Sequence, residues 1–506
     1  MSNMTDKSKI LRQESLMMPT VHNPFVHKIE LSILDKIRIA VCTVTIFPIR
    51  LIILLILLLL AWLIARIALL GLKDEDFKEP FSGWRKKLHK PYVSVCCLGR
   101  LFAGFRVAVK GQRASREEVT LLVVAPHSSY FDSAVVSGLG MPSAVSKLEM
   151  RSVPIIGSLV SVLQPVFVSR NDPESRQKTI KEIKRRAQSG GKWPQIIIFP
   201  EGTCTNRSCL IGFKGGAFYP GVAVQPAVIR YHIFPDTVTW TWEGPGAYTI
   251  LWLTLCNFNN QVEVEFLPVY HPSEEEINDP KLYARNVRAV MAKALNVPVT
   301  DHTYEDIRLM LQATEEGLPL HSGLVEFQKL RTKLGLSLEN MTDLLAIYSE
   351  IARSDDNTIH IDDFAKYLNV PVSPALKEMF ELYDRNQSGK IDFREYIIGC
   401  SLLSQPANSE DTIQLAFQMF DDGEKGYITQ DELSQILHNA FGMTETDVAK
   451  LFQQVDSDGC GRITYDEFKM YAQKKPEYAM LFKTYQEMKV KEDSAETPKD
   501  GKLKSE

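Results

Sequence analysis

The pattern of hydrophobic and polar residues first indicates a membrane anchor near the N-terminus. Ile39–Phe47 is apolar, Pro48-Ile49-Arg50 interrupts it, and Leu51–Ala65 is a charge-free block of 15 residues. A spanning helix needs about 20 apolar residues, and a central arginine costs about 2.5 to 3.5 kcal/mol on insertion scales. The whole stretch therefore spans only if it tolerates Arg50. A single span and a hairpin bent at Pro48 both remain open.

Short apolar runs rich in Val and Ile follow between about Pro80 and Val299, each bounded by Pro, Gly or charge. Such runs are typical of buried strands, and the spacing between the first few leaves room for helices. They predict an α/β domain with strands at Val119–Ala125, Gln164–Val168, Gln195–Phe199, Val222–Ile229 and Val262–Val269. Tyr248–Cys256 is also apolar but too short to span a membrane, so a core strand, a core helix and partial insertion at the membrane interface remain open.

The C-terminal part contains amphipathic helices separated by acidic loops. Asp384–Glu395 (DRNQSGKIDFRE) has oxygen-bearing residues at positions 1, 3, 5, 9 and 12 and a glycine at position 6, which is the EF-hand calcium pattern. Asp421–Glu432 and Asp456–Glu467 repeat it, with first residues 37 and 35 positions apart. Repetition strengthens the prediction beyond a single match. Asp355–Phe364 is a degenerate candidate partner for the first loop.

The three loops differ in the ligands they offer. Gly423 removes an oxygen from the middle loop and Lys425 places an ammonium where another belongs, so we predict a structural role for it. In the third loop Cys460 supplies a soft ligand poorly suited to calcium, and weak binding or none remains open. The predicted calcium ligands are Asp384, Asn386, Ser388, Lys390 through its carbonyl, Glu395, Asp456, Asp458 and Glu467.

Composition adds two local charge imbalances to this picture. The formal net charge of −4 gives no support for nucleic-acid binding. Residues 73–118 carry 11 Lys or Arg and 6 Asp or Glu, whereas residues 384–467 carry 6 and 16. The first region suits an anionic surface and the second suits a cation. The 8 cysteines show neither a disulfide nor a zinc spacing, which favours a reducing compartment.

Candidate catalytic residues follow the predicted strand that ends at Ala125. His127 precedes Asp132 by five residues at the carboxyl end of that strand, where open α/β sheets place their sites. A turn there brings the two side chains together, so that Asp132 orients the imidazole and its other nitrogen takes a proton from a hydroxyl. By itself the spacing also fits a capping or core histidine. Two further strand ends carry Arg170 and the string Glu201–Arg207 (EGTCTNR).

Together, HSSYFD, FPEGTCTNRS and PGVAVQPAVIRY resemble the HxxxxD acyltransferases that acylate glycerophospholipids. With the appended EF-hands, the chain resembles the lysophosphatidylcholine acyltransferase family, types 1 and 2, over about Phe25 to Met488. The resemblance implies transfer of an acyl or acetyl group from acyl-CoA or acetyl-CoA to the sn-2 hydroxyl of a lysophospholipid, with calcium modulation. The acceptor would be lysophosphatidylcholine or lyso-platelet-activating factor.

The resemblance also implies roles for individual residues. His127 would be the general base and Asp132 its orienting partner. Cys204 has no predicted histidine partner, so we do not assign it as a nucleophile. The implied substrate-binding residues are Arg170, Glu201, Gly202, Thr203 and Arg207.

Two other functions remain open at this point. One is a lysophosphatidic acid or glycerol-phosphate acyltransferase, and the other is a non-catalytic, membrane-anchored calcium-binding protein. We expect the endoplasmic reticulum membrane, with the Golgi or the lipid droplet surface as alternatives, and with the catalytic and EF-hand domains facing the cytosol. Lys502 and Lys504 near the end of the chain resemble a dilysine retrieval signal.

The predicted fold class is therefore an α/β acyltransferase domain with a mixed sheet flanked by helices. A membrane helix or hairpin precedes it, and an all-α EF-hand domain follows. The predicted boundaries are a polar segment at 1–35, the anchor at 36–72, the acyltransferase domain at 80–300, linker helices at 301–335, the EF-hand region at 336–488 and a disordered tail at 489–506.

Overall fold

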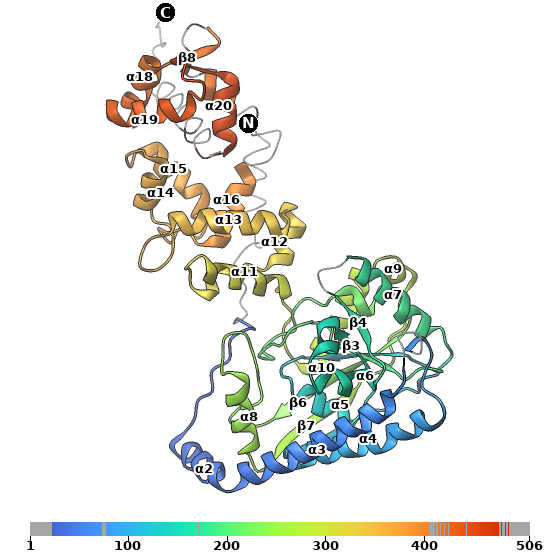
Figure 1. Cartoon of the computed structure of the whole chain (residues 1–506). Coiled ribbons are helices and arrows are strands. Elements are labelled where there is room, and N and C mark those ends of the chain that lie inside the picture. The colour runs from blue at the N-terminus through green and yellow to red at the C-terminus, as the bar shows by residue number, and fades with distance from the viewer. Residues whose placement is uncertain are drawn as a thin grey trace, which may run out of the picture. The chain divides into compact units, whose positions relative to one another are not determined.

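The computed structural model describes residues 23–72, 77–169, 173–403, 425–441 and 443–474, with single residues and short pieces between 410 and 484 (Figure 1). These residues form two compact units, one up to Tyr304 and one from Glu305 onward. The tail predicted at 489–506 and most of the polar N-terminal segment lie outside the described residues.

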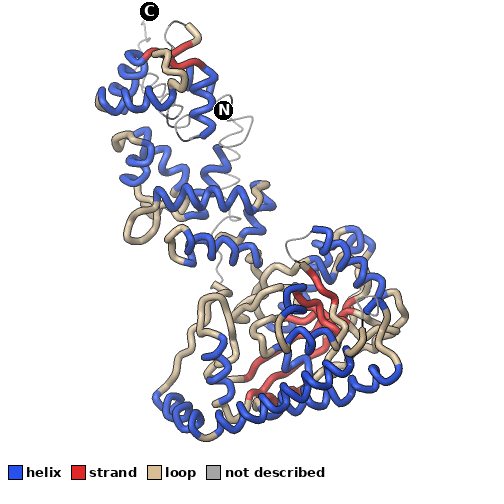
Figure 2. Tube along the Cα trace, viewed as in Figure 1, coloured by secondary structure: helices blue, strands red, loops and turns tan. Residues whose placement is uncertain are grey.

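A seven-stranded mixed sheet forms the centre of the first unit (Figure 2). Its strand order is β1-β7-β6-β2-β5-β3-β4, and each neighbouring pair is parallel except the antiparallel pair β6 and β7. The strands are β1 Phe105–Lys110, β2 Leu121–Ala125, β3 Ser143–Lys147, β4 Val166–Val168, β5 Ile196–Ile198, β6 Val224–His232 and β7 Asn260–Phe266. All five predicted strands are present, and the predicted mixed sheet is confirmed.

Helices cover both faces of this sheet. Leu121 and Val123 of β2 pack into a core with α10 and α7, whereas Leu122 and Val124 pack with α5 and α8 on the opposite face. Successive strand side chains point to opposite faces, so β2 is apolar throughout because both faces are buried. The helices of this unit are α2 Ile33–Val44, α3 Ile46–Leu69, α4 Gly83–Phe102, α5 Asp132–Ser137, α6 Ile156–Ser161, α7 Pro173–Ala187, α8 Ala247–Leu255, α9 Glu274–Asn278 and α10 Pro280–Leu295.

The predicted anchor consists of two helices, and the chain bends at Thr45 rather than at Pro48. Pro48 lies in the first turn of α3, where its missing N–H leaves no intrahelical hydrogen bond unmade. Among the described residues, α3 is the one helix long and apolar enough to cross a membrane. It lies side by side with α4, where Ala61 and Ala65 pack against Tyr92 (Figure 1).

Arg50, which complicates a membrane span, is satisfied by the protein itself. Its guanidinium donates to the carbonyl oxygens of Leu255 at 2.8 Å and Phe258 at 3.1 Å, and also to that of Asn257. These carbonyls lie at the C-terminal end of α8, where a cation is favoured by the helix dipole. The segment Tyr248–Cys256 is thus largely a helix, and α8 connects α3 to the sheet core.

The described residues of the second unit are helical apart from two short strands, β8 Tyr427–Thr429 and β9 Arg462–Thr464 (Figure 2). These strands pair antiparallel and place Ile428 opposite Ile463. A single antiparallel bridge joins Ile359 to Ile391 in the same way. The loops therefore associate two by two, and the degenerate segment near 355 pairs with loop 384–395. The helices are α11 Tyr304–Glu315, α12 Phe327–Leu334, α13 Leu338–Ile351, α14 Ile361–Leu368, α15 Pro374–Tyr383, α16 Phe393–Leu403, α18 Gln430–Phe441, α19 Glu445–Val455 and α20 Tyr465–Lys474.

Candidate active site and calcium loops

His127 and Asp132 meet in the turn between β2 and α5. The imidazole Nδ1 of His127 lies 2.6 Å from Oδ2 of Asp132, whose side chain is only 1% exposed. The same carboxylate oxygen accepts the backbone N–H groups of Ser128 at 3.0 Å and Ser129 at 3.3 Å. With Nδ1 donating to an ionised carboxylate, the Nε2 nitrogen is left to accept a proton. The structure thus brings the two predicted catalytic side chains together.

The surroundings of His127 favour its protonated form. Burial by itself lowers the pKa of His127, but hydrogen bonds to Asp132 and to the Cys204 thiol outweigh burial and hold the pKa well above its ordinary value. The ring of Phe199 packs on the imidazole with centroids 4.5 Å apart. Cys204 thus lies close to His127, although the sequence by itself indicates no histidine partner for it. The turn that carries it folds back onto His127, whose carbonyl accepts the N–H of Thr205 at 2.8 Å.

Glu201 connects the turn that carries His127 to the turn that carries Thr205. The side chain is fully buried, with one oxygen accepting the N–H of His127 at 3.3 Å and the other accepting the hydroxyl of Thr205 at 3.2 Å. Burial raises the pKa of Glu201 to about 8. Glu201 thereby supports the turn between β2 and α5 that carries His127 and Asp132, hereafter the catalytic turn.

Gly202 and Thr203 continue this turn and are fixed by different contacts. Gly202 has a φ of +68°, a backbone conformation that favours glycine, and the Lys214 side chain packs over it. The hydroxyl of Thr203 accepts the indole N–H of Trp242 at 2.9 Å.

Arg207 reaches the catalytic turn from the end of the same loop. Its guanidinium forms an ion pair with Asp236, donates to the hydroxyl of Ser128 at 3.1 Å and lies 5.0 Å from the ring centroid of Tyr231. Burial by itself raises the pKa of Asp236, but the Arg207 guanidinium and the Thr239 hydroxyl hold it below its usual range. A fixed cation therefore lies beside the histidine. Arg170 lies outside the described residues.

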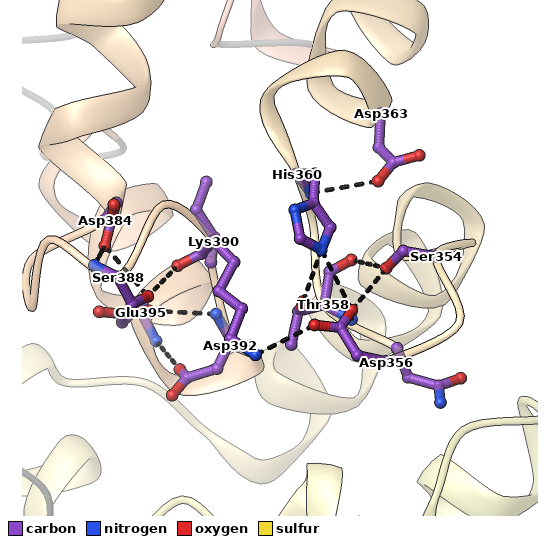
Figure 3. A network of polar contacts seen from close by, with 12 residues as sticks. Ser354, Asp356, Thr358, His360, Asp363, Asp384, Ser388, Lys390, Asp392 and Glu395 are labelled. Atoms are coloured by element: carbon purple, nitrogen blue, oxygen red, sulfur yellow. Dashed lines mark hydrogen bonds and ion pairs between the residues drawn. The ribbon is translucent and has the colours of Figure 1, made fainter.

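Loop 384–395 gathers oxygen atoms around its centre (Figure 3). Asp384 accepts the N–H groups of Ser388 at 2.9 Å and Gly389 at 2.8 Å, while Glu395 accepts that of Asn386 at 3.3 Å. Burial and the neighbouring Asp392 carboxylate raise the pKa of Glu395 to about 7. Such crowding of carboxylates, with hard oxygens on a twelve-residue loop, fits calcium.

Lys390 at position 7 of this loop turns its side chain away from the centre. Its ammonium lies 3.0 Å from a carboxylate oxygen of Asp356 in the degenerate loop, as Figure 3 shows. The Lys390 carbonyl accepts the hydroxyl of Ser388 at 3.0 Å. The Thr358 hydroxyl and the Lys390 ammonium hold the pKa of Asp356 well below its usual range. The two paired loops are thus joined by an ion pair as well as by the backbone bridge.

The middle loop contains its own cation. The Lys425 ammonium forms an ion pair with Glu432, the position-12 carboxylate, and the Lys425 N–H donates to Asp421 at 2.8 Å. In this loop a protein ammonium is bound by the carboxylate that would otherwise ligate calcium.

The third loop keeps its acidic ligands together. Ligand atoms of Asp456, Asp458 and Cys460 lie within 4.8 Å of one another, and the third-loop Glu467 accepts the N–H of Ser457 at 3.0 Å. The cysteine therefore occupies a ligand position, as its place in the loop predicts, and the site offers one soft atom among hard oxygens.

Comparison with known proteins agrees with both halves of this arrangement. Profiles match the Acyltransferase family at residues 106–235, the EF hand domain at 375–403 and the EF-hand domain pair at 410–473. The chain is 50% identical over 481 residues to lysophosphatidylcholine acyltransferase 2 of Danio rerio, covering 94% of this chain and 90% of that protein. It belongs to the lysophosphatidylcholine acyltransferase family. The predicted family and the predicted class, an acyltransferase joined to EF-hands, are confirmed.

Human relatives in this lysophosphatidylcholine acyltransferase family are similarly close. Lysophosphatidylcholine acyltransferase 1 of Homo sapiens is 50% identical over 466 residues, covering 92% of this chain and 87% of the relative. The corresponding type 2 protein is 47% identical over 481 residues, covering 95% and 88%. A crystal structure of the 1-acyl-sn-glycerophosphate acyltransferase from Thermotoga maritima matches 52% of this chain and 96% of its own, with 19% identity and a TM-score of 0.35.

Sequence reasoning missed two residues that complete the site of this family member. Tyr231 donates its hydroxyl to Oδ1 of Asp132, and Asp236 forms the ion pair with Arg207. A signal for Tyr231 was available, because it lies near the end of a predicted strand. The parallel register of β2 and β6 pairs Ala125 with Val228, so that Tyr231 falls level with the catalytic turn. Asp236 follows the strand in a loop, and its role depends on the fold of that loop.

Proposed function

We propose that this chain is a membrane-bound acyl-CoA:lysophospholipid O-acyltransferase acting on the sn-2 hydroxyl. The acceptor is lysophosphatidylcholine or lyso-platelet-activating factor. The observation that carries the proposal is the 2.6 Å contact between His127 and Asp132 at the carboxyl end of β2, in a chain about half identical to lysophosphatidylcholine acyltransferases over nearly its whole length.

The mechanism uses His127 as the general base. Its Nε2 takes the proton of the sn-2 hydroxyl while the hydroxyl oxygen attacks the thioester carbonyl, forming the ester C–O bond. The C–S bond then breaks, and the departing thiolate of coenzyme A takes up the proton held by His127. Asp132 keeps the ring oriented and stabilises the imidazolium formed in between. Atoms and charges balance without an acyl-enzyme intermediate.

Arg207 supplies the fixed charge for the lysolipid phosphate. A guanidinium makes forked, charge-assisted hydrogen bonds to phosphate oxygens. The Arg207 guanidinium donates to the hydroxyl of Ser128, the residue that follows His127. Gly202 and Thr203, in the loop that ends at Arg207, and Arg170 remain sequence-based candidates for substrate binding. For Glu201 we propose that it holds the two turns in place, since its carboxylate is bonded to both.

The anchor holds the site at a membrane surface. The exposed face of α2 carries Ile33, Leu34, Ile37 and Val41, and α3 adds further exposed apolar side chains such as Leu55. Because Arg50 is bonded to the carbonyls after α8, the start of α3 is attached to the catalytic domain. This favours an anchor lying along the domain over a free span. We propose the endoplasmic reticulum membrane, with both folded units on the cytosolic side.

Calcium binding at loop 384–395 modulates the activity of this enzyme. Its ligands are Asp384, Asn386, Ser388, the Lys390 carbonyl and Glu395, and the metal supplies the positive charge that this oxygen set lacks. The loop 456–467, with Asp456, Asp458 and Glu467, is a weaker second site.

Acyl transfer measured with the purified full-length protein in lipid vesicles tests the proposal. Acyl-CoA and acetyl-CoA are each supplied with lysophosphatidylcholine, lyso-platelet-activating factor, lysophosphatidic acid or glycerol 3-phosphate. We expect turnover with the first two acceptors, its loss in His127→Ala, and its retention in His271→Ala, an exposed histidine outside the site. Turnover restricted to lysophosphatidic acid or glycerol 3-phosphate would replace this acceptor assignment. If the wild-type protein binds calcium but turns over none of these pairs, the proposed acyltransferase activity is excluded.

A further inference from the structure

Tyr231 occupies a position between the two halves of the site. It lies near the end of β6, next to β2, and is half-buried. Its hydroxyl donates to Asp132, and its ring face lies against the guanidinium of Arg207 at 5.0 Å from ring centroid to the guanidinium carbon. One side chain thus touches both the partner of the general base and the candidate phosphate ligand.

The Tyr231 hydroxyl holds Oδ1 of Asp132, whereas the hydrogen bonds from the catalytic turn itself go to Oδ2. Oδ2 of Asp132 accepts from His127, Ser128 and Ser129, all within its own turn. Oδ1 accepts from Tyr231, which lies 99 residues further along the chain. Holding both oxygens sets the plane of the carboxylate, and that plane sets the direction of the imidazole.

Burial and the Asp132 charge raise the pKa of Tyr231 well above its ordinary value. The phenol therefore keeps its proton and remains a donor at any pH at which the enzyme works. The charged or titratable groups that face it are Asp132, Arg207 and Cys204.

We propose that Tyr231 is a positioning residue that aligns Asp132 through its hydroxyl and Arg207 through its ring. The inference rests on the proposed function, because it assigns the two contacts to the chemical step and to phosphate binding respectively. It predicts that the two parts of one side chain control different kinetic constants.

Two substitutions separate these parts. Tyr231→Phe removes the hydroxyl and keeps the ring, so kcat should fall about tenfold while KM for the lysolipid stays within about twofold. Tyr231→Leu removes both, so kcat should fall similarly and KM should rise about threefold or more. Tyr270→Phe is the matched control. Its hydroxyl also donates to a carboxylate, that of Glu276 at 2.6 Å, away from the site, and neither constant should change.

A double substitution distinguishes a positioning role of Tyr231 from a merely structural one. In a His127→Ala background Tyr231→Phe should cause no further loss of turnover, because the group that it positions is gone. Thermal unfolding of each variant shows whether it is folded, and if Tyr231→Leu is not, the Phe variant and the double substitution decide. Wild-type kcat in folded Tyr231→Phe, alongside an inactive His127→Ala, would overturn this inference and leave the proposed function intact. An active His127→Ala would instead overturn the proposed function.

Discussion

The catalytic turn and calcium loop 384–395 both bury carboxylates, but they neutralise them differently. Asp132 is surrounded by donors that the chain supplies itself, including His127 and Tyr231. In the calcium loop, Asp384 and Glu395 accept backbone N–H groups while the Lys390 ammonium turns outward to another loop. A carboxylate saturated by protein donors can orient a base. A cluster left with excess negative charge favours a cation from solution.

Loop 421–432 lies between these two cases. It keeps the first and last acidic residues of the calcium pattern, yet Lys425 brings an ammonium to Glu432. The spacing of acidic residues therefore does not decide whether a loop needs a metal. What decides is whether a basic side chain of the protein reaches the same oxygens.

The largest expected effect comes from removing the base of the catalytic turn. General-base assistance contributes about 10² to 10⁴-fold, so His127→Ala should lose that much turnover while calcium binding is unchanged. Asp132→Asn keeps a hydrogen-bond acceptor but loses the charge that stabilises the imidazolium, and its loss should be smaller though still large. Turnover and calcium titration of the same preparations check both. Retention of a tenth of wild-type turnover in His127→Ala would show that the base lies elsewhere.

The matching experiment on the calcium side removes the position-12 ligand. Glu395→Gln deletes a carboxylate from the most complete ligand set, so the strongest calcium binding event in calorimetry should disappear. Acyl transfer measured without calcium should stay unchanged, which tests the separation of the two regions. A strong binding event that persists would place the main site in loop 456–467 instead.

Replacing Arg207 tests the cation beside the catalytic turn. Arg207→Ala should raise KM for the lysolipid and lower kcat, about tenfold in kcat/KM, because phosphate binding also positions the hydroxyl. Lys214→Ala provides a comparison with another cation of the same region. It packs over Gly202 and the ring of Tyr304. If kcat changes while KM for the lysolipid does not, the assignment of Arg207 to phosphate binding is wrong.

The pH dependence of activity is expected to be more moderate. The base must be neutral, and its pKa is held above the ordinary value of 6.5 by Asp132 and Cys204. Activity should therefore increase with pH, with a midpoint above 6.5, and be lost as His127 becomes protonated on the acidic side. Glu201 also titrates near this range, so Glu201→Gln is compared in the same profile. A kcat/KM profile that is flat or falls between about pH 6 and 8 would contradict the assignment.

Much of this arrangement could be predicted from the sequence, and the exceptions have physical causes. β2 and β5 could be predicted because strands covered on both faces are apolar throughout. β7 could be predicted although Glu263 and Glu265 alternate with its buried valines. The sequence does not predict β1 (FRVAVK), because its apolar residues are interrupted by charged ones and most of the strand is exposed. It does not predict β3 (SAVSK), because that strand is short and only partly apolar. The contact of Cys204 with His127 depends on how the EGTCTNR turn folds back, which spacing alone does not reveal. The ion pair of Lys425 with Glu432 follows directly from their positions in one loop.

The smallest effect is expected where the protein already supplies the cation. Glu432→Gln removes the same position-12 carboxylate as Glu395→Gln, but from a loop in which Lys425 is bonded to it and position 3 is Gly423. The strongest calcium binding event should therefore remain nearly unchanged in calorimetry, with the same affinity and heat. The two substitutions are chemically identical and occur at equivalent positions, so any difference between them reports the ligand set alone. Equal losses from both would show that Lys425 leaves the loop when calcium arrives, and that the middle loop is a metal site after all.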